Sequence, residues 1–281
     1  MLKQRIITAL LMLAILLPAV FYPAPEAFGV VAVVLISAGA WEWAKLNQYG
    51  QRSALLTGAF CVVLCAASWY GGLVHTPLKG VWMVAGSAWV VLGAWLLHGG
   101  ISAWASVPRA LRLAGGILAL WVAWLAVTQA RIIGVNFLFS ILVLVWVADV
   151  FAYFTGRALG GRFFTRKLAP SISPGKTWEG ACGGMVGVVV CALIWRSLDG
   201  LAAPEQAGIY SRLGAVGLPF MVLAVLFLST MSVVGDLVES LFKRSAGVKD
   251  SSGLLPGHGG VLDRVDALLP ILPLAMMLTS L

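Results

Sequence analysis

Long apolar runs recur from the first residues of the chain to the last, and short polar or Gly/Pro-rich stretches separate them. The 281 residues are 60% hydrophobic and 11% charged, and the mean hydropathy is +0.97. A soluble all-helical protein is the alternative, but it needs a polar surface that this composition lacks. A membrane β-barrel is disfavoured because the runs are continuous and do not alternate. The sequence therefore predicts an all-α, polytopic integral membrane protein.

We expect about nine transmembrane helices, separated by turns rich in Pro, Gly and Asn. The predicted spans are residues 6–22, 27–43, 53–74, 81–97, 111–127, 132–153, 180–195, 216–234 and 267–281. Several are shorter than the roughly 20 residues of a perpendicular membrane helix, so we expect their ends to extend into polar flanks. The first run is interpreted as an uncleaved span, because its apolar part is long for a signal peptide.

The distribution of Lys and Arg predicts the orientation. If the N-terminus is cytoplasmic and the spans alternate, all but four of the 19 basic residues fall on the cytoplasmic side. The four exceptions are Lys79, Arg131, Arg196 and Arg212. This asymmetry favours a cytoplasmic N-terminus and places loops 154–179 and 236–266 on the same, cytoplasmic side.

The chain divides by its chemistry into two regions. Residues 1–131 contain five spans and are interpreted as a transmembrane scaffold, with tryptophans near the span ends as in an interfacial belt. Glu42 in this region lies beside Lys45 and is interpreted as half of an interfacial ion pair. Residues 132–281 form the predicted catalytic region, which includes both cytoplasmic loops.

Acidic residues concentrate in the second region. Seven of the 11 acids lie at or near the cytoplasmic ends of the last four spans: Asp149, Glu179, Asp236, Glu239, Asp250, Asp263 and Asp266. An ionisable group at membrane depth costs a few kcal/mol, about 3 on insertion scales, so such groups indicate function.

Their spacing places several of these acids on shared helix faces. Asp236, Glu239, Ser240 and Lys243 follow at i, i+3, i+4 and i+7, and Asp263 and Asp266 at i, i+3. A glycine-rich loop at 253–260 joins the two groups, and basic residues flank them. Carboxylates beside Lys and Arg suit a divalent metal that shares phosphate ligands. The alternative is a set of interfacial salt bridges between neighbouring helix ends.

The other cytoplasmic loop contains Ser173-Pro-Gly-Lys176-Thr177 directly before a predicted helix. It lacks the first glycine of a Walker motif, and no strand precedes it. Free backbone N–H groups at a helix start, with Lys and Thr beside them, nevertheless predict an anion site.

For Asp149 and His258, the sequence allows two interpretations each. Asp149 either pairs with Arg157 or takes a catalytic or ligand role. His258 either acts as a base or simply fits its turn between glycines, and without a second histidine nearby it is not interpreted as a metal ligand.

The segment from Ser240 to Asp266 carries a family signature. Its fixed positions are Ser240, Leu241, Phe242, Lys243, Arg244, Lys249, Asp250, Ser252, Leu255, Pro256, His258, Gly259, Gly260, Val261, Asp263, Arg264, Val265 and Asp266. This pattern resembles that of the phosphatidate cytidylyltransferases, or CDP-diacylglycerol synthases. Residues 149–157 and 173–180 also resemble that family, whereas the first five spans match it in hydropathy more than in motif.

The resemblance implies an activity: CTP and phosphatidate react to CDP-diacylglycerol and diphosphate for phospholipid biosynthesis. It further implies Mg²⁺ held by Asp236 and Asp263, possible sharing of the site with K⁺, a homodimer, and an active site on the cytoplasmic face of the inner membrane. The candidate catalytic residues are Asp236, Asp263, Lys249, Asp250, Asp266 and His258. The candidate substrate-binding residues are Lys243, Arg244, Arg264, Ser240, Ser173, Lys176, Thr177 and Arg157.

Three other activities compete with this interpretation. A CTP-dependent polyprenol kinase would use similar groups but transfer the γ-phosphate, and a phosphosugar–polyprenyl-phosphate transferase would lack the Ser240–Asp266 pattern. A cation- or proton-coupled transporter would place its acids in mid-span instead of gathering them at one face. A nucleic-acid partner is not expected, because the excess of positive charge follows the membrane pattern.

Overall fold

The computed structural model describes residues 2–201 and 206–281, which form helices and connecting loops without a strand. The all-α class expected from the sequence is confirmed. In chain order the elements are α1 (Leu2–Phe21), α2 (Glu26–Leu46), α3 (Gln51–Tyr70), the 3-10 turn η1 (Leu73–His75), α4 (Lys79–Ser106), α5 (Arg109–Ile133), α6 (Val135–Leu159), α7 (Trp178–Asp199), α8 (Ile209–Val216), α9 (Leu218–Ser245), α10 (Leu262–Val265) and α11 (Leu268–Thr279).

Within the described residues, 8 helices are long and apolar enough to cross a membrane, namely α1 to α7 and α9. The expected count of nine is not confirmed, because residues 267–281 form α11, a helix of only 12 residues. At 1.5 Å per residue it extends about 18 Å, well short of the ~30 Å hydrocarbon core. It contains Pro273, and Pro270 to Met276 are buried inside the protein.

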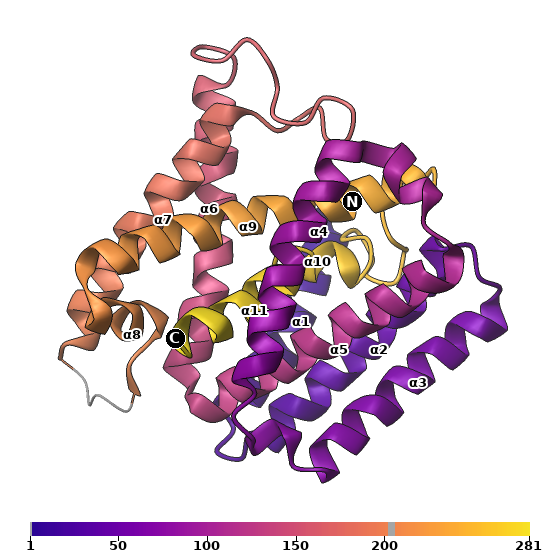
Figure 1. Ribbon diagram of the computed structural model, residues 1–281, viewed down its shortest axis with the longest axis horizontal. Coiled ribbons are helices and arrows are strands. Elements are labelled where there is room, and N and C mark those ends of the chain that lie inside the picture. Colours follow the sequence, from indigo (N-terminus) through magenta and orange to yellow (C-terminus); the bar gives the residue numbers. More distant parts are fainter. Residues whose placement is uncertain (1, 202–205) are drawn as a thin grey trace.

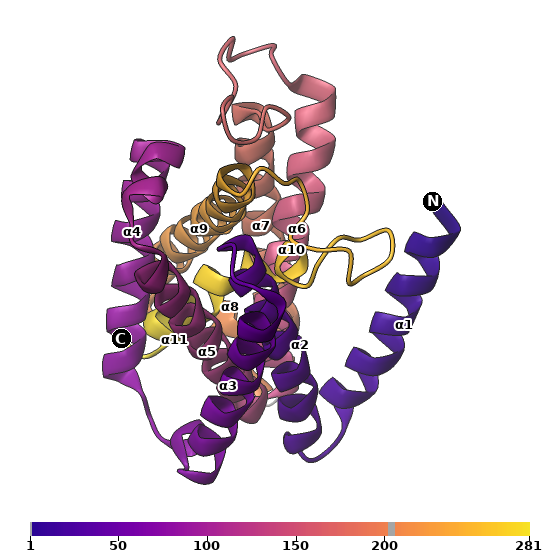
Figure 2. The ribbon, with the colours of Figure 1, turned by 90° about the vertical axis from the view of Figure 1, so that its right-hand side faces the viewer.

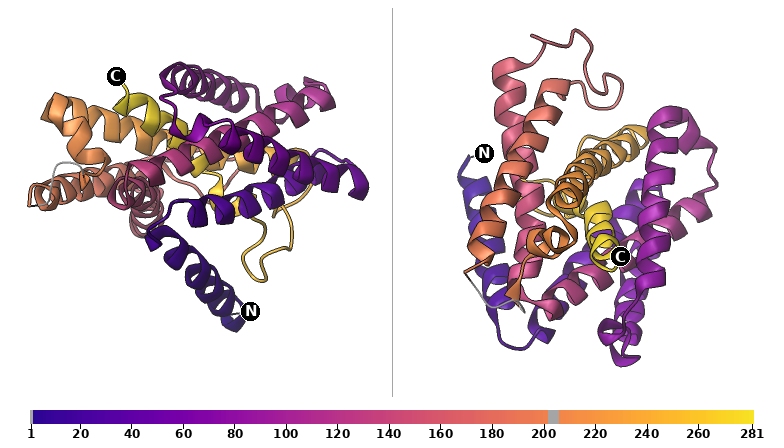
Figure 3. Two further views of the ribbon diagram at one scale, coloured as in Figure 1. Left: turned by 90° about the horizontal axis from the view of Figure 1, so that it is seen from below. Right: turned by 60° about the vertical axis from the view of Figure 1, so that its left-hand side comes forward.

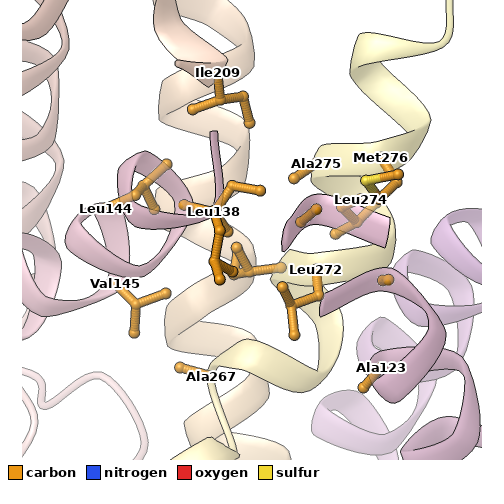
Figure 4. Packing of buried hydrophobic residues seen from close by; sticks show 14 of the residues in the cluster. Ala123, Leu138, Leu144, Val145, Ile209, Ala267, Leu272, Leu274, Ala275 and Met276 are labelled. Carbon is orange, nitrogen blue, oxygen red and sulfur yellow. The ribbon is translucent and has the colours of Figure 1, made fainter. Parts of the chain in front are cut away.

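The apolar character of α11 serves the protein interior. Figure 4 shows Leu272 and Leu274 of α11 and Leu138 of α6, all members of one cluster of buried side chains. A helix that is apolar all round and too short to span is typical of a buried core element. Composition alone does not distinguish a membrane span from a buried core helix.

Helices α4, α5, α6, α8 and α9 contact α11. In Figure 1, α6 and α7 form a hairpin that rises above the rest of the molecule, and α9 crosses it at a large angle. Helices α2, α3 and α5 pack as a second group, which Figure 3 shows from two further directions. The close approach of α6 and α7 depends on Gly184, where an added Cβ would lie 2.8 Å from the Ala148 carbonyl oxygen.

Helix α1 stands apart from the bundle along most of its length (Figure 2). Its first half nevertheless reaches the loop before α10, where the Thr8 hydroxyl donates to the Pro256 carbonyl oxygen at 2.9 Å. The N-terminal end of α1 and this loop therefore lie on the same side of the molecule, as the predicted topology requires.

Candidate active site

The predicted stripe of α9 is present, and its side chains contact one another. Ser240 donates to Asp236 at 3.3 Å, and Lys243 forms an ion pair with Glu239, each one helical turn apart. Helix α9 runs to Ser245, so much of the expected loop 236–266 is helical. What remains is a loop at residues 246–261, which we call the α9–α10 loop.

Asp263 of α10 closes this loop onto α9. Its Oδ1 accepts from Lys243 Nζ at 2.6 Å. Its Oδ2 accepts from the Ser251 amide and hydroxyl, both at 2.9 Å, and from the Gly260 amide at 2.8 Å. Burial by itself would raise the pKa of Asp263, but the hydrogen bonds from Lys243, Gly260 and Ser251 outweigh it and hold the pKa at about 2. Asp263 is therefore an ionised carboxylate in this arrangement.

The loop between α6 and α7, residues 160–177, lies against the same end of α9; we call it the α6–α7 loop. Lys176 forms an ion pair with Asp236, and Arg244 donates to the Ile172 carbonyl oxygen at 3.3 Å. The two regions that the sequence singled out separately therefore share one end of α9. Figure 1 shows the α6–α7 loop at the top of its hairpin.

Local hydrogen bonds explain the shape of the α6–α7 loop. Thr177 is the N-cap of α7, and its hydroxyl oxygen accepts from the Gly180 amide at 3.1 Å. Oε1 of the buried Glu179 accepts from three loop amides, those of Gly161, Phe163 and Phe164, each at 3.0 Å. Ser173 is half-buried at a tight turn in which its amide donates to the Ala169 carbonyl oxygen.

A cavity of about 460 Å³ lies between α6, α7 and α9. This volume falls within the range of roughly 300–1,000 Å³ that small-molecule sites occupy. Small residues such as Ala148, Ala181 and Gly184 line its apolar part. Its polar lining is formed by Asp149, Tyr153, Arg157, Lys176, Thr177, Ser229 and Asp236. The cavity thus joins carboxylates, two basic side chains and an apolar wall, a combination suited to an anionic headgroup with an attached chain.

Several predicted site residues lie outside this cavity. Lys249, Asp250 and Arg264 are exposed, and the described residues provide no ion-pair partner for them. His258 is half-buried, with its Nδ1 buried and without a hydrogen-bond partner within the described chain. Burial, followed by the charge of Asp236, raises the pKa of Asp266 well above its ordinary value.

Asp149 faces the cavity and does not pair with Arg157 in the part of the chain that the structure describes. Arg157 instead donates to the Tyr153 hydroxyl at 3.1 Å. The ion-pair interpretation of Asp149 is therefore not supported.

The sequence interpretation of Glu42 is wrong. Its side chain forms no ion pair with Lys45 among the described residues and is fully buried, at 0% exposure. Both carboxylate oxygens accept hydrogen bonds from the α9–α10 loop and the start of α10. The available signal was an acid within an apolar helix, which normally indicates a function or a specific partner.

Comparison with known proteins identifies the family. The chain matches the cytidylyltransferase family over residues 3–281. It is 38% identical over 279 residues to the phosphatidate cytidylyltransferase of Pseudomonas aeruginosa, with 97% of this chain and 95% of the relative covered. The chain belongs to the cytidylyltransferase family.

Other members of the family agree with this assignment. The phosphatidate cytidylyltransferase of Haemophilus influenzae is 35% identical over 293 residues, which cover 97% of this chain and 96% of the relative. That of Bacillus subtilis is 41% identical, but over 148 residues and 53% of this chain. The family resemblance expected from the signature is thus confirmed, and the chain is an enzyme of this family with helices suited to a membrane.

The donor chemistry of this cytidylyltransferase fits a divalent cation. Mg²⁺ is commonly held by one or two carboxylates and completes its shell with phosphate oxygens and water. In the part of the chain that the structure describes, each oxygen of Asp236 has a single partner, Ser240 Oγ for Oδ1 and Lys176 Nζ for Oδ2. Asp263 Oδ1 also has a single partner there, Lys243 Nζ. Within the described residues no group of three or more His, Cys, Asp or Glu side chains could hold a metal.

Proposed function

We propose that this enzyme transfers the cytidylyl group of CTP to phosphatidate and releases diphosphate. An oxygen of the phosphatidate phosphate forms a bond to the α-phosphorus of CTP, and the bond from that phosphorus to the bridging oxygen of the diphosphate breaks. The observation that carries the proposal is the chain-long similarity to relatives named phosphatidate cytidylyltransferase. The cavity beside α9 agrees with it.

The geometry supports specific roles in this reaction. The lipid phosphate is already anionic, so it needs orientation and charge neutralisation more than a strong base. Lys176 and Arg157, which line the cavity, are positioned to bind such a phosphate, and Thr177 has a hydroxyl hydrogen free to donate. The small apolar residues of the cavity wall accommodate the glycerol and the first part of the acyl chains.

The basic residues around the α9–α10 loop are proposed to bind the triphosphate of CTP. These residues are Lys243, Arg244, Lys249 and Arg264. Asp250 and Asp266 are proposed to orient them, and His258 and Ser240 to complete the site near Asp263 and Asp236. Ser173 is proposed to contribute to the anion clamp of the α6–α7 loop.

Mg²⁺ is the proposed cofactor, with Asp236 and Asp263 as its protein ligands and K⁺ as a second cation. When bound, it would neutralise charge on the phosphates of CTP and on the departing diphosphate. The contacts of Lys176 with Asp236 and of Lys243 with Asp263 orient both carboxylates.

We further propose that the enzyme works at the cytoplasmic face of a bacterial inner membrane, as a homodimer. The distribution of basic residues supports the orientation, and the family resemblance is the basis for the dimer. The shared side of the α1 N-terminus and the two loops agrees with the orientation.

Incubation of the purified enzyme with CTP labelled at the α-phosphate and with phosphatidate tests the function. Label in a lipid product together with release of diphosphate is expected, and chelation of Mg²⁺ should abolish both. Free labelled CDP without labelled lipid would instead indicate a CTP-dependent kinase. Failure to consume CTP with any lipid phosphate would overturn the proposal.

A further inference from the structure

Glu42 connects the N-terminal helices to the active-site loop. It lies in the second half of α2, where the neighbouring positions Trp43 and Ala44 are also buried. Its partners lie 209 to 220 residues away in the sequence. A buried carboxylate in an apolar helix is expensive unless donors satisfy it, so this contact determines whether both segments can pack.

Both oxygens of Glu42 are used. Oε1 accepts from the Ser252 hydroxyl at 2.6 Å and from the Val261 amide at 2.9 Å. Oε2 accepts from the Leu262 amide at 2.8 Å and from the Ser251 hydroxyl at 3.3 Å. A carboxylate has about four acceptor positions, and donors reach both oxygens of Glu42. Three of them come from the α9–α10 loop and one from the start of α10, and the Ser251 hydroxyl shares its single hydrogen with Asp263. The carboxylate therefore holds residues 251 and 252 of the α9–α10 loop against the C-terminal end of that loop.

The same loop residues also hold Asp263. The amide and hydroxyl of Ser251 donate to Asp263 Oδ2, and the Ser251 hydroxyl lies between this oxygen and Glu42. Gly260 donates its amide to Asp263, and the next residue, Val261, donates to Glu42. The two carboxylates thus bind adjacent donors on the same short segments. A shift of the loop away from Glu42 would move the donors that orient Asp263.

The loop packs tightly at this contact. A Cβ added at Gly260 would overlap both the Ser251 hydroxyl and the Glu42 carboxylate. Water could satisfy the first amides of α10, but it could not fix the loop at one distance from α2. Glu42 therefore fixes the position of the α9–α10 loop in addition to accepting its hydrogen bonds.

We propose that Glu42 is a positioning residue for the cytidylyl transfer: from α2 it fixes the α9–α10 loop so that Asp263 and Lys243 keep their catalytic orientation. This inference rests on the proposed function. It assigns the N-terminal helices a direct part in the active site, in place of the scaffold role expected from their sequence.

The test compares Glu42→Gln with Glu26→Gln. Both substitutions remove one carboxylate from α2, but Glu26 is exposed at the opposite end of the helix. In Glu42→Gln the new amide would present an NH₂ group to two of the four donors, so the loop contact breaks while the side-chain shape stays. We expect kcat of Glu42→Gln to fall roughly ten- to hundredfold, the usual cost of losing a group that orients a ligand. In Glu42→Gln, KM for CTP should change less than kcat. In the control Glu26→Gln, kcat should stay within about twofold of the wild-type value.

Hydrogen exchange provides a readout independent of activity. In Glu42→Gln the amides of Val261 and Leu262 should exchange faster than in the wild type, while Glu26→Gln leaves them unchanged. Glu42→Asp, which keeps the charge, should recover part of both kcat and protection. If the wild type failed to make the lipid product, the proposed function would fail, yet the exchange data would still test the loop contact.

Two further variants keep the inference testable if Glu42→Gln does not fold. Ser252→Ala removes the shortest of the four hydrogen bonds, and Gly260→Ala pushes the loop from the carboxylate without altering it. Both should lower kcat and accelerate exchange at Val261 and Leu262. If Glu42→Gln folds, near wild-type kcat or unchanged hydrogen exchange in that variant would overturn the inference. If it does not fold, the same result in both Ser252→Ala and Gly260→Ala would overturn it.

Discussion

Two loops meet at the end of α9, and a buried glutamate holds each of them. Glu179 holds the α6–α7 loop from 15 to 18 residues away, through one carboxylate oxygen. Glu42 holds the α9–α10 loop from more than two hundred residues away, through both oxygens. The first contact is local and shapes its own hairpin. The second couples the N-terminal helices to the predicted catalytic region, so its loss should reach the chemistry.

The largest effect is expected at the two carboxylates that the loops contact, Asp236 of α9 and Asp263 of α10. Asp263→Asn and Asp236→Asn should each lower kcat by about 10³-fold, the scale on which electrostatic stabilisation of a transition state acts. Turnover of labelled CTP measures the effect. Asp199→Asn is the control, because Asp199 accepts hydrogen bonds from Asn136, Gly208 and Ser211 at the other end of α7. Near-normal activity of either site variant would remove the metal assignment.

The second-largest effect is expected from loss of the ion pair between the α6–α7 loop and α9. Lys176→Ala removes a cation from the cavity and the ion pair of Asp236, which keeps its hydrogen bond from Ser240. We expect KM for phosphatidate to rise about tenfold, because a charge-assisted hydrogen bond contributes about 1.5–3 kcal/mol. Steady-state kinetics in mixed micelles measure it, with the exposed Lys167→Ala of the same loop as control. Equal KM values for the two variants would limit this loop to a structural role.

The two glutamates should respond differently to the same substitution. Glu179→Gln can keep a carbonyl oxygen in front of its three amides, because only Oε1 accepts from them. Glu42→Gln cannot, because both of its oxygens accept. We therefore expect kcat of Glu179→Gln to fall less than about threefold, since neutral acceptors retain roughly half of the strength of charged ones. A fall in kcat as large as that of Glu42→Gln would contradict the distinction between Glu179, which shapes its own hairpin, and Glu42, which connects distant segments.

The smallest effect should come from the contact of α1 with the α9–α10 loop. Thr8→Val removes the hydrogen bond to the Pro256 carbonyl oxygen while keeping the side-chain shape. The expected loss of stability is about 1 kcal/mol or less, visible as a small decrease in Tm, with kcat unchanged. Thr57→Val, which loses only a hydrogen bond within α3, provides the comparison. A large fall in kcat for Thr8→Val alone would show that α1 also positions the loop.

Much of the fold was accessible from the sequence because its determinants are local. Long apolar runs predicted the eight helices that could span a membrane. Helix α9 extends further than expected into its polar end, and α4 continues past a break at Gly100. The run at 267–281 was misassigned because its composition suits a membrane span as well as a buried core. Its actual length and its burial among α5, α6 and α9 decide the matter.

The candidate site was accessible in part for the same reason. The i, i+4 contacts of Asp236 with Ser240 and of Glu239 with Lys243 follow from helical periodicity. For Lys176 and Asp236, the sequence predicted only that their two loops lie on the same side of the membrane. Glu42 was misread, because a neighbouring lysine in the sequence offered a simpler partner than serines at positions 251 and 252.

The sequence by itself thus determined the membrane class, the helical stripes and, through the Ser240–Asp266 pattern, the family. These properties depend on composition, on the 3.6-residue period and on a continuous motif, all of which are read along the chain. Only the tertiary structure decided that α11 lies in the core and that Glu42 of α2 contacts the α9–α10 loop. Both depend on which distant segments meet, and a buried carboxylate is stable only where the folded chain brings donors to it.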